Sequence, residues 1–166
     1  MGGARTGWRI WLEESGLPDQ AAGQRGPRER GYRSVPHTAD LRIEAWGPTR
    51  EDCIAEAVRG LVDSFADVRG AGDQQAWQRR LDAGSDADLL AAAVEEVIYV
   101  LDTGGQIPAG VEVGRAAGGG IDLTLRLVSA DEAEIIGAAP KAASLSGLAC
   151  AAGPSGGWAC AVTVDV

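Results

Sequence analysis

The chain has 166 residues, enough for one domain with a hydrophobic core of ordinary size, and no apolar run reaches the roughly 18–20 residues that a membrane span needs. Its formal net charge is −9, and the negative field of such a protein disfavours direct binding to a nucleic-acid backbone. The three cysteines show no CxxC spacing, which indicates neither a disulfide framework nor a zinc site and favours a cytoplasmic location.

The N-terminal segment differs in composition from the rest of the chain. Residues 1–31 combine Gly, Arg, Gln and Pro without sustained periodicity. This composition predicts a flexible Arg/Gly-rich extension, followed by one folded domain over residues 32–166. Trp8–Leu12 is short and is followed by two glutamates, which does not fit the apolar region of a secretory signal.

The first clear strand and helix patterns follow one another directly. Apolar residues alternate from Leu41 to Ala45, which is typical of a half-buried strand. Thr49 and Asp52 then form a T-x-x-D helix start, and apolar residues recur with helical spacing up to about Ala66. We therefore expect an amphipathic helix immediately after this strand.

The second half of the chain contains one more helix and several strands. A weak strand pattern covers residues 74–83, and Ser85 and Asp88 begin a second helix that stops near Gly104. Two helices and about six antiparallel strands predict an α+β fold, in which layered sheets and two amphipathic helices form a single domain. The remaining strands are predicted at Val111–Val113, Ile121–Val128, Glu134–Ala138, Ala143–Ala149 and Trp158–Asp165.

Three polar places stand out against these elements. His37, the only histidine, and Asp40 lie in the segment HTAD before the first predicted strand. Lys141, the only lysine, opens a later strand, and Asp165 ends the small and polar face of the last strand. From the pattern alone, Asp40 and His37 read as turn residues, Lys141 as a surface cation and Asp165 as a solvated end.

Other possible sites are weaker. Glu95 and Glu96 are adjacent on the second helix and point about 100° apart, which favours a solvated helix face over an acid–base pair. Cys150 and Cys160 read as small buried hydrophobic residues without chemistry. The segment GRAAGGGID lacks the strand-to-helix context of a phosphate loop, so we expect a hairpin turn there.

Four segments carry a resemblance to a known family. HTADLRIEAWGPTREDCIAEAVRGLVDSF, LLAAAVEEVIYVLD, PKAASLSGL and WACAVTVDV, in this order, resemble the archease family over residues 31–166. The resemblance implies a small acidic α+β protein that assists the GTP-dependent RNA ligase of tRNA splicing and RNA repair. Such a protein would promote guanylylation and multiple turnover of the ligase and would not itself be an enzyme.

The resemblance also implies which residues act. It carries the functional positions of the family over to Asp40, Lys141 and Asp165. The two aspartates would hold a divalent metal ion (calcium, magnesium or manganese) together with oxygens of Val166, because hard cations prefer carboxylate and carbonyl oxygens. Lys141 would meet a phosphate or an acidic group of the partner. His37 is not one of the positions carried over; from its place in the sequence we expect it to shape the turn that aims Asp40, with contact to the metal or the partner as the alternative.

The chain departs from the family at one motif, and two other functions stay open. Where the family usually has a tyrosine and a histidine after the lysine motif, this chain has Leu145 and Ser146, which lowers the expected affinity of the site. One alternative is a small metal-dependent hydrolase, which would act without a partner and use Asp40, Asp165 and Lys141. The other is a chaperone-like partner of tRNA-modifying enzymes.

Overall fold

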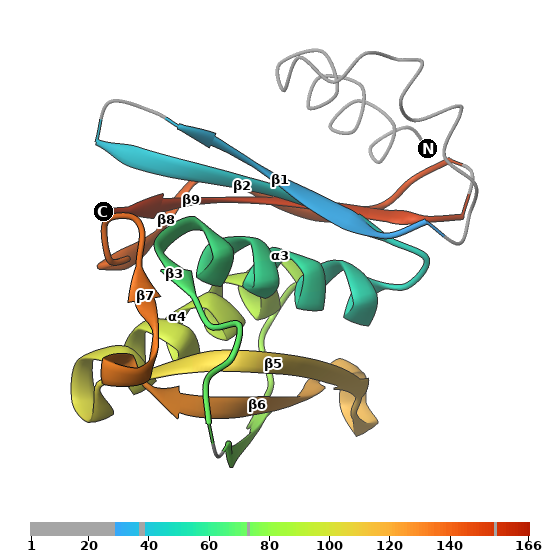
Figure 1. Cartoon of the computed structure of the whole chain (residues 1–166). Coiled ribbons are helices and arrows are strands. Elements are labelled where there is room, and N and C mark those ends of the chain that lie inside the picture. Colours follow the sequence, from blue (N-terminus) through green and yellow to red (C-terminus); the bar gives the residue numbers. More distant parts are fainter. Residues whose placement is uncertain (1–28, 37–38, 73, 155) are drawn as a thin grey trace.

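The computed structural model describes residues 29–36, 39–72, 74–154 and 156–166. His37 and nearly all of the predicted N-terminal extension therefore lie outside the described residues. Within them, two helices lie between a four-stranded and a three-stranded antiparallel sheet (Figure 1). This arrangement confirms the α+β single domain, with layered sheets and two helices, that the sequence predicts.

The larger sheet combines strands from distant parts of the sequence. Its order is β1, β2, β9, β8, and every neighbouring pair is antiparallel. The latest strand in sequence, β9, therefore lies in the interior of the sheet (Figure 1). The bounds of these strands are Gly31–Pro36 for β1, Asp40–Gly47 for β2, Ala142–Ala152 for β8 and Trp158–Asp165 for β9.

The two long helices, α3 (Arg50–Phe65) and α4 (Asp86–Gly104), begin where the sequence predicts. The side-chain oxygens of the N-cap residues Thr49 and Ser85 each accept a hydrogen bond from the N–H three residues later, at 3.0 and 3.1 Å. These bonds satisfy N–H groups that the first helical turn leaves unpaired. Helix α4 ends at Gly105, whose φ of +58° is a left-handed conformation that glycine adopts at little cost.

The smaller sheet has the order β4, β6, β5, and a separate pairing joins the short strands β3 and β7. The glycine-rich segment between β5 and β6 is a turn, as predicted, in which Gly118 and Gly119 have φ values of +75° and +87°. The bounds are Ala66–Asp67 for β3, Gln75–Leu81 for β4, Gln106–Arg115 for β5, Ile121–Ser129 for β6 and Glu134–Ile135 for β7.

Strand β1, the two-residue strand β3 and the first half of β5 are not predicted by the sequence pattern. Strand β1 lies at an edge of the larger sheet and ends at Pro36, and its residues show no alternation of apolar side chains. Edge strands tolerate proline because one row of their N–H groups needs no partner. Strand β5 begins at Gln106, and the shift of its register between Pro108 and Gly110 breaks the period-two pattern there.

The core fills the space between the two sheets and the helices. Helix α3 packs against β1, β2 and β9 on one side and β5 on the other, while α4 packs against β8 and β5. The predicted faces of β9 are confirmed on the core side, where Val162 and Val164 are fully buried. No helix among the described residues is long and apolar enough to cross a membrane. Large side chains with almost no exposure include Ile43, Ile54, Leu61, Phe65, Leu90, Ile107, Leu125 and Leu127.

Candidate functional site

Two chain segments meet Asp165 at one end of the larger sheet. Asp40 is the first residue of β2, not a residue before the strand as the sequence suggested, and it pairs directly with Asp165 of β9. On the opposite side of β9, Asp165 pairs with Ala142 at the start of β8. The Asp165 carbonyl oxygen accepts a hydrogen bond from the Lys141 N–H at 2.8 Å. The sheet thus places Asp40, Asp165 and the backbone of Lys141 side by side.

The main chain of Val166 is tied to the same place. Its N–H donates a hydrogen bond to the carbonyl oxygen of Ala39, with a nitrogen–oxygen distance of 3.5 Å. Because Ala39 directly precedes Asp40, this contact extends the β2–β9 pairing by one residue beyond the end of β9. Four of the five predicted site residues therefore converge; the fifth, His37, lies outside the described residues.

The two aspartates form a pair of like charges. Directly opposed residues of antiparallel strands project their side chains to the same face of a sheet. Asp40 and Asp165 therefore share the face turned away from the helices, since the residues next to them along the strands, Leu41 and Val164, pack toward the core. Like charges in this position repel one another, so a cation bound between them would stabilise the fold.

The arginine two residues after Asp40 on the same strand does not neutralise the pair. Arg42 lies two residues after Asp40, but its Nε donates to Glu44 at 3.1 Å and its guanidinium also reaches the carbonyl oxygen of Gly147 at 3.4 Å. Glu44 is only 2% exposed and pairs with Arg33 as well. Within the described part of the chain, neither aspartate has an ion-pair partner.

Lys141 lies beside the aspartates with an exposed side chain, after the buried Pro140. No ion pair of Lys141 occurs among the described residues. Its backbone is held by the bond to Asp165, while its ammonium group is available to an anion from outside. A lysine of this kind acts as a flexible point charge for a phosphate or a carboxylate.

A residue that sequence reasoning set aside helps to position this region. The Glu95 carboxylate accepts a hydrogen bond from the Ala143 N–H at 2.8 Å and so ties α4 to the beginning of β8, two residues after Lys141. Glu96 instead accepts a hydrogen bond from Trp77 of β4 at 3.0 Å. The two glutamates contact different sheets, so they form more than the solvated helix face that the sequence predicts, and Glu95 has a structural role.

The predicted departure from the family motif lies in an irregular part of β8. The register between β8 and β9 shifts between Ser144 and Ala149. Leu145 is 77% exposed and Ser146 is exposed as well, so neither fills a space in the core. The two replaced positions therefore lie on the surface, a few residues along the strand from Lys141.

The donor set fits a hard divalent cation in its chemistry but is incomplete by itself. Asp40 and Asp165 supply two carboxylates, and main-chain oxygens of Val166 lie next in the chain. Among the described residues there is no group of three or more His, Cys, Asp or Glu side chains that could hold a metal ion. Because Ca²⁺ and Mg²⁺ take at least six ligands, the pair fits a weak, open site that water or a partner would complete.

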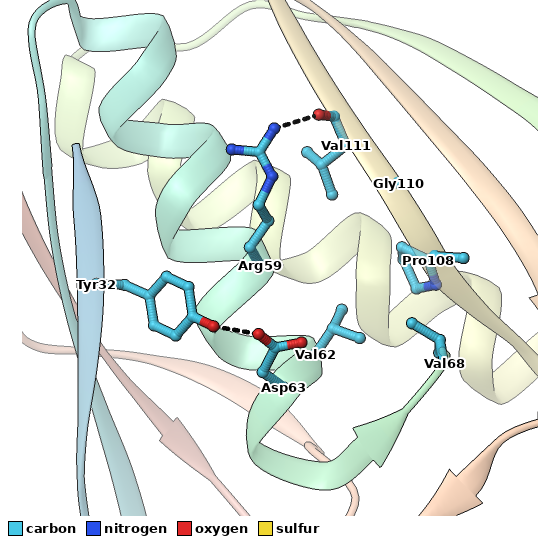
Figure 2. Close-up of a pocket in the computed structure, with 9 residues that line it drawn as sticks. Tyr32, Arg59, Val62, Asp63, Val68, Pro108, Gly110 and Val111 are labelled. Atoms are coloured by element: carbon cyan, nitrogen blue, oxygen red, sulfur yellow. Dashed lines mark hydrogen bonds between the residues drawn. The ribbon is translucent and has the colours of Figure 1, made fainter. Parts of the chain in front are cut away.

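A separate cavity of about 170 Å³ lies between α3, β1 and β5 (Figure 2). Its polar side chains are already bonded, since the Tyr32 hydroxyl donates to Asp63 and Arg59 donates to the Val111 carbonyl oxygen at 2.8 Å. The bond to Asp63 raises the pKa of Tyr32 to about 12. Of the predicted site residues that the structure describes, none lines this cavity, so it is separate from the end of the larger sheet.

Comparisons with known proteins agree with the resemblance seen in the sequence. The model of the Archease protein family matches residues 32–166. The "Probable protein archease" of Mycobacterium tuberculosis (strain CDC 1551 / Oshkosh) is 52% identical over 136 residues, which cover 82% of this chain and 75% of that protein. The "Protein archease" of Archaeoglobus fulgidus is 28% identical over 116 residues, which cover 69% of this chain and 84% of that protein.

A solved structure shares the fold. The solution structure of Methanobacterium thermoautotrophicum protein 1598 superposes with a TM-score of 0.63 at 17% sequence identity, and the match covers 82% of this chain and 99% of that one. At this identity the likeness concerns the fold alone. The family match and the 52% identical relative carry the assignment, and this chain belongs to the archease family.

Proposed function

We propose that this chain is an accessory protein that binds a divalent cation through Asp40, Asp165 and Val166 and promotes guanylylation and multiple turnover of a GTP-dependent RNA ligase in tRNA splicing or RNA repair. Membership in the archease family supports an accessory role. The single observation that carries the proposal is the direct pairing of Asp40 with Asp165, beside Lys141, at the end of the larger sheet.

The paired carboxylates are suited to share a cation with another protein. Two aspartates without a basic partner in the described chain attract a cation, yet they leave most of its coordination positions open. A bound divalent cation supplies positive charge that stabilises negatively charged phosphate oxygens during nucleotidyl transfer. The role of Asp40 and Asp165 would be to hold that charge at the contact with the ligase.

Lys141 would contribute to the same contact from the neighbouring strand. Its backbone is fixed by the hydrogen bond to Asp165 and, through Ala143, by Glu95 of α4. An exposed ammonium group held at this place can pair with a phosphate of the nucleotide or with an acidic side chain of the ligase. Lys141→Arg retains the positive charge and should keep part of this interaction, whereas Lys141→Ala should remove it.

The overall charge favours a protein partner over RNA. A chain with a net charge of −9 is repelled by a phosphate backbone and attracted by the basic surface of an enzyme that handles RNA. We therefore expect direct association with the ligase and no measurable affinity for RNA alone at physiological salt. Binding to the ligase should weaken as the salt concentration rises.

The test combines the full chain with a GTP-dependent RNA ligase present in fewer copies than its RNA substrate. We expect faster formation of the ligase–GMP adduct and many ligations per ligase molecule. Asp40→Asn and Asp165→Asn should each remove most of this gain, whereas Asp122→Asn, a change at an exposed aspartate of the other sheet, should not. Unchanged stimulation by the two site variants would refute the proposed site.

Cation binding is measured separately, without the ligase. Mn²⁺ is added to the chain, and binding is measured as the decrease of the electron paramagnetic resonance signal of unbound Mn²⁺. We expect weak binding to the wild-type chain. Asp40→Asn should abolish this binding, and Asp122→Asn should leave it intact. Hydrolysis of phosphate esters by the chain alone, lost in Asp40→Asn, would instead support the metal-dependent hydrolase. Recovery of a tRNA-modifying enzyme, with no binding to the ligase, would support the chaperone-like alternative.

A further inference from the structure

The three cysteines, of which Cys150 and Cys160 are expected to be small hydrophobic residues without chemistry, converge on the core side of the larger sheet. Cys150 of β8 and Cys160 of β9 are directly opposed in the antiparallel register. Cys53, in the first turns of α3, has its sulfur 3.0 Å from the sulfur of Cys160. Positions far apart in the sequence, without any recognisable motif, therefore form one thiol cluster.

The cluster has the geometry for a disulfide bond. Directly opposed residues of an antiparallel pair have Cα atoms about 4.5–5.5 Å apart. A disulfide bridges Cα atoms at about 4.4–6.8 Å, so a bond between Cys150 and Cys160 requires little backbone movement. The sulfurs of Cys53 and Cys160 are about 1 Å beyond the bonded distance of about 2.0 Å. Cys160 thus has a possible partner on each side.

The three cysteines differ in exposure as residues. Cys53 and Cys160 have 0% exposure, whereas Cys150 is partly exposed. Among the described side chains no group of three, the thiols included, is arranged to hold a metal ion. Because Cys150 is the partly exposed cysteine, a small oxidant would reach Cys150 first, and the two buried thiols would react only after it.

The surroundings of Cys150 favour its reactive form. Hydrogen bonds from Cys160 and then Cys53 to the thiolate lower the pKa of Cys150 to about 5, and the positive charge of Arg50 acts in the same direction. Burial and the negative charge of Asp86 oppose this shift. Thiolates, not thiols, attack peroxides and disulfides, so a partly exposed thiolate beside two thiols is poised to react.

We propose that Cys150, Cys160 and Cys53 form a peroxide-reactive thiol centre that closes one intramolecular disulfide. In the first step the Cys150 thiolate attacks the O–O bond of hydrogen peroxide, which leaves a sulfenic acid on Cys150 and releases hydroxide. In the second step the Cys160 sulfur attacks the Cys150 sulfur, the S–O bond breaks, and the departing hydroxide takes the proton of Cys160 as water. Two thiols lose two electrons, and the peroxide is reduced to water.

Cys53 permits a further exchange. Its sulfur can attack Cys160 in the new disulfide, since the two sulfurs are already in contact, and release Cys150 as a thiol. The bond would then connect α3 to β9 instead of β8 to β9. Either product leaves one thiol free, and a thiol reductant would restore all three.

The thiol centre is separate from the candidate cation site. Cys160 and Asp165 lie on opposite faces of β9 and five residues apart, which corresponds to roughly 17 Å along a strand. The inference therefore does not rest on the proposed function. Its experiments need neither the ligase nor a divalent cation, so they can fail or succeed independently.

The test exposes the reduced full chain to hydrogen peroxide, blocks the remaining thiols with iodoacetamide, and maps disulfides by mass spectrometry without reduction. We expect the loss of two of the three thiols and a peptide pair joined through Cys160, with Cys150 or with Cys53. Dithiothreitol should reverse the change. Three free thiols after treatment, or a product that is only an intermolecular dimer, would overturn the proposal.

Variants assign the steps. Cys150→Ser should slow the loss of thiols at least tenfold, whereas Ala151→Ser, the exposed neighbour on the same strand, should not. In the double variant Cys53→Ala/Cys160→Ala, which leaves no second thiol beside Cys150, the sulfenic acid on Cys150 should accumulate and be trapped by dimedone. If the double variant does not fold, the single variant Cys53→Ala is the second test: it should still form the Cys150–Cys160 disulfide. Equal oxidation rates in Cys150→Ser and the wild-type chain would contradict Cys150 as the first site.

Discussion

Cys160 and Asp165 lie on the same strand, yet their surroundings differ in every physical respect. Cys160 faces the core, has no exposure and contacts another thiol, whereas Asp165 faces outward, is exposed and stands opposite a second carboxylate. Residue alternation along β9 separates the two faces. The neighbouring strands differ at the two positions: β2 places Asp40 opposite Asp165 on the outer face, and β8 places Cys150 opposite Cys160 on the core face.

One strand can carry residues of two unrelated proposed sites when its neighbouring strands differ at each end. The buried end depends on packing and on weak sulfur hydrogen bonds. The open end depends on charge and on what arrives from solution. Four measurements test this difference.

The largest effect concerns the reactivity of Cys150 as a function of pH. With its pKa lowered to about 5 from the ordinary value of 9.0, Cys150 stays a thiolate across neutral pH. Alkylation of Cys150 by iodoacetamide should therefore change less than about twofold between pH 6 and 8, whereas the unfolded chain should change by about a hundredfold. A hundredfold change in the folded chain would show that the thiol cluster does not stabilise the thiolate.

A second measurement compares the two faces of β9 by stability. Val162 is fully buried, and Val162→Ala removes two methyl groups and leaves a cavity, which should cost about 2 kcal/mol in the free energy of unfolding. Thr163→Ala on the outer face should cost less than about 0.5 kcal/mol. Urea denaturation of both variants gives the comparison, and equal losses would contradict the assignment of faces.

A third measurement concerns the anchor of the open end. Glu95→Ala leaves the Ala143 N–H without its acceptor, which should cost about 1 kcal/mol and accelerate hydrogen exchange at that amide. Glu95→Gln keeps a carbonyl oxygen as an acceptor and serves as the matched control. If exchange at Ala143 is unaffected in Glu95→Ala, the bond contributes nothing to the position of β8 beside the candidate site.

The smallest effect is the electrostatic one. In the presence of a chelator, Asp165→Asn should stabilise the chain by about 0.5 kcal/mol, since it removes the repulsion with Asp40. Added Mn²⁺ should stabilise the wild-type chain and not the variant. A gain from Mn²⁺ that is the same in both chains, measured as the shift of the unfolding temperature, would contradict a cation between these aspartates.

The sequence predicts those parts of the fold that local rules determine. Thr49 and Ser85 mark the starts of α3 and α4 because capping depends on residues close in sequence. Strand β1 escapes prediction because an edge strand with a proline carries little alternation, and its pairing with β2 is a tertiary contact.

The residues of the two proposed sites are also brought together by tertiary contacts, which local sequence patterns do not predict. Asp40, Lys141 and Asp165 are found through a resemblance to a family, not through spacing, since only the sheet register brings them together. Neither a family resemblance nor a local motif predicts the thiol cluster. Cys53 and Cys160 are in contact because α3 packs across β9, and the residues around each cysteine do not indicate this contact.

The interior place of β9 also has a consequence during synthesis. Strands β1 and β2 emerge from the ribosome long before β9, so the hairpin waits with one edge of β2 unpaired. An unpaired edge is a template for wrong association, and pairings of high sequence separation form late and slowly. Because Asp40 has Asp165 opposite it only once β9 is in the sheet, the candidate site requires the β2–β9 pairing and cannot form before it.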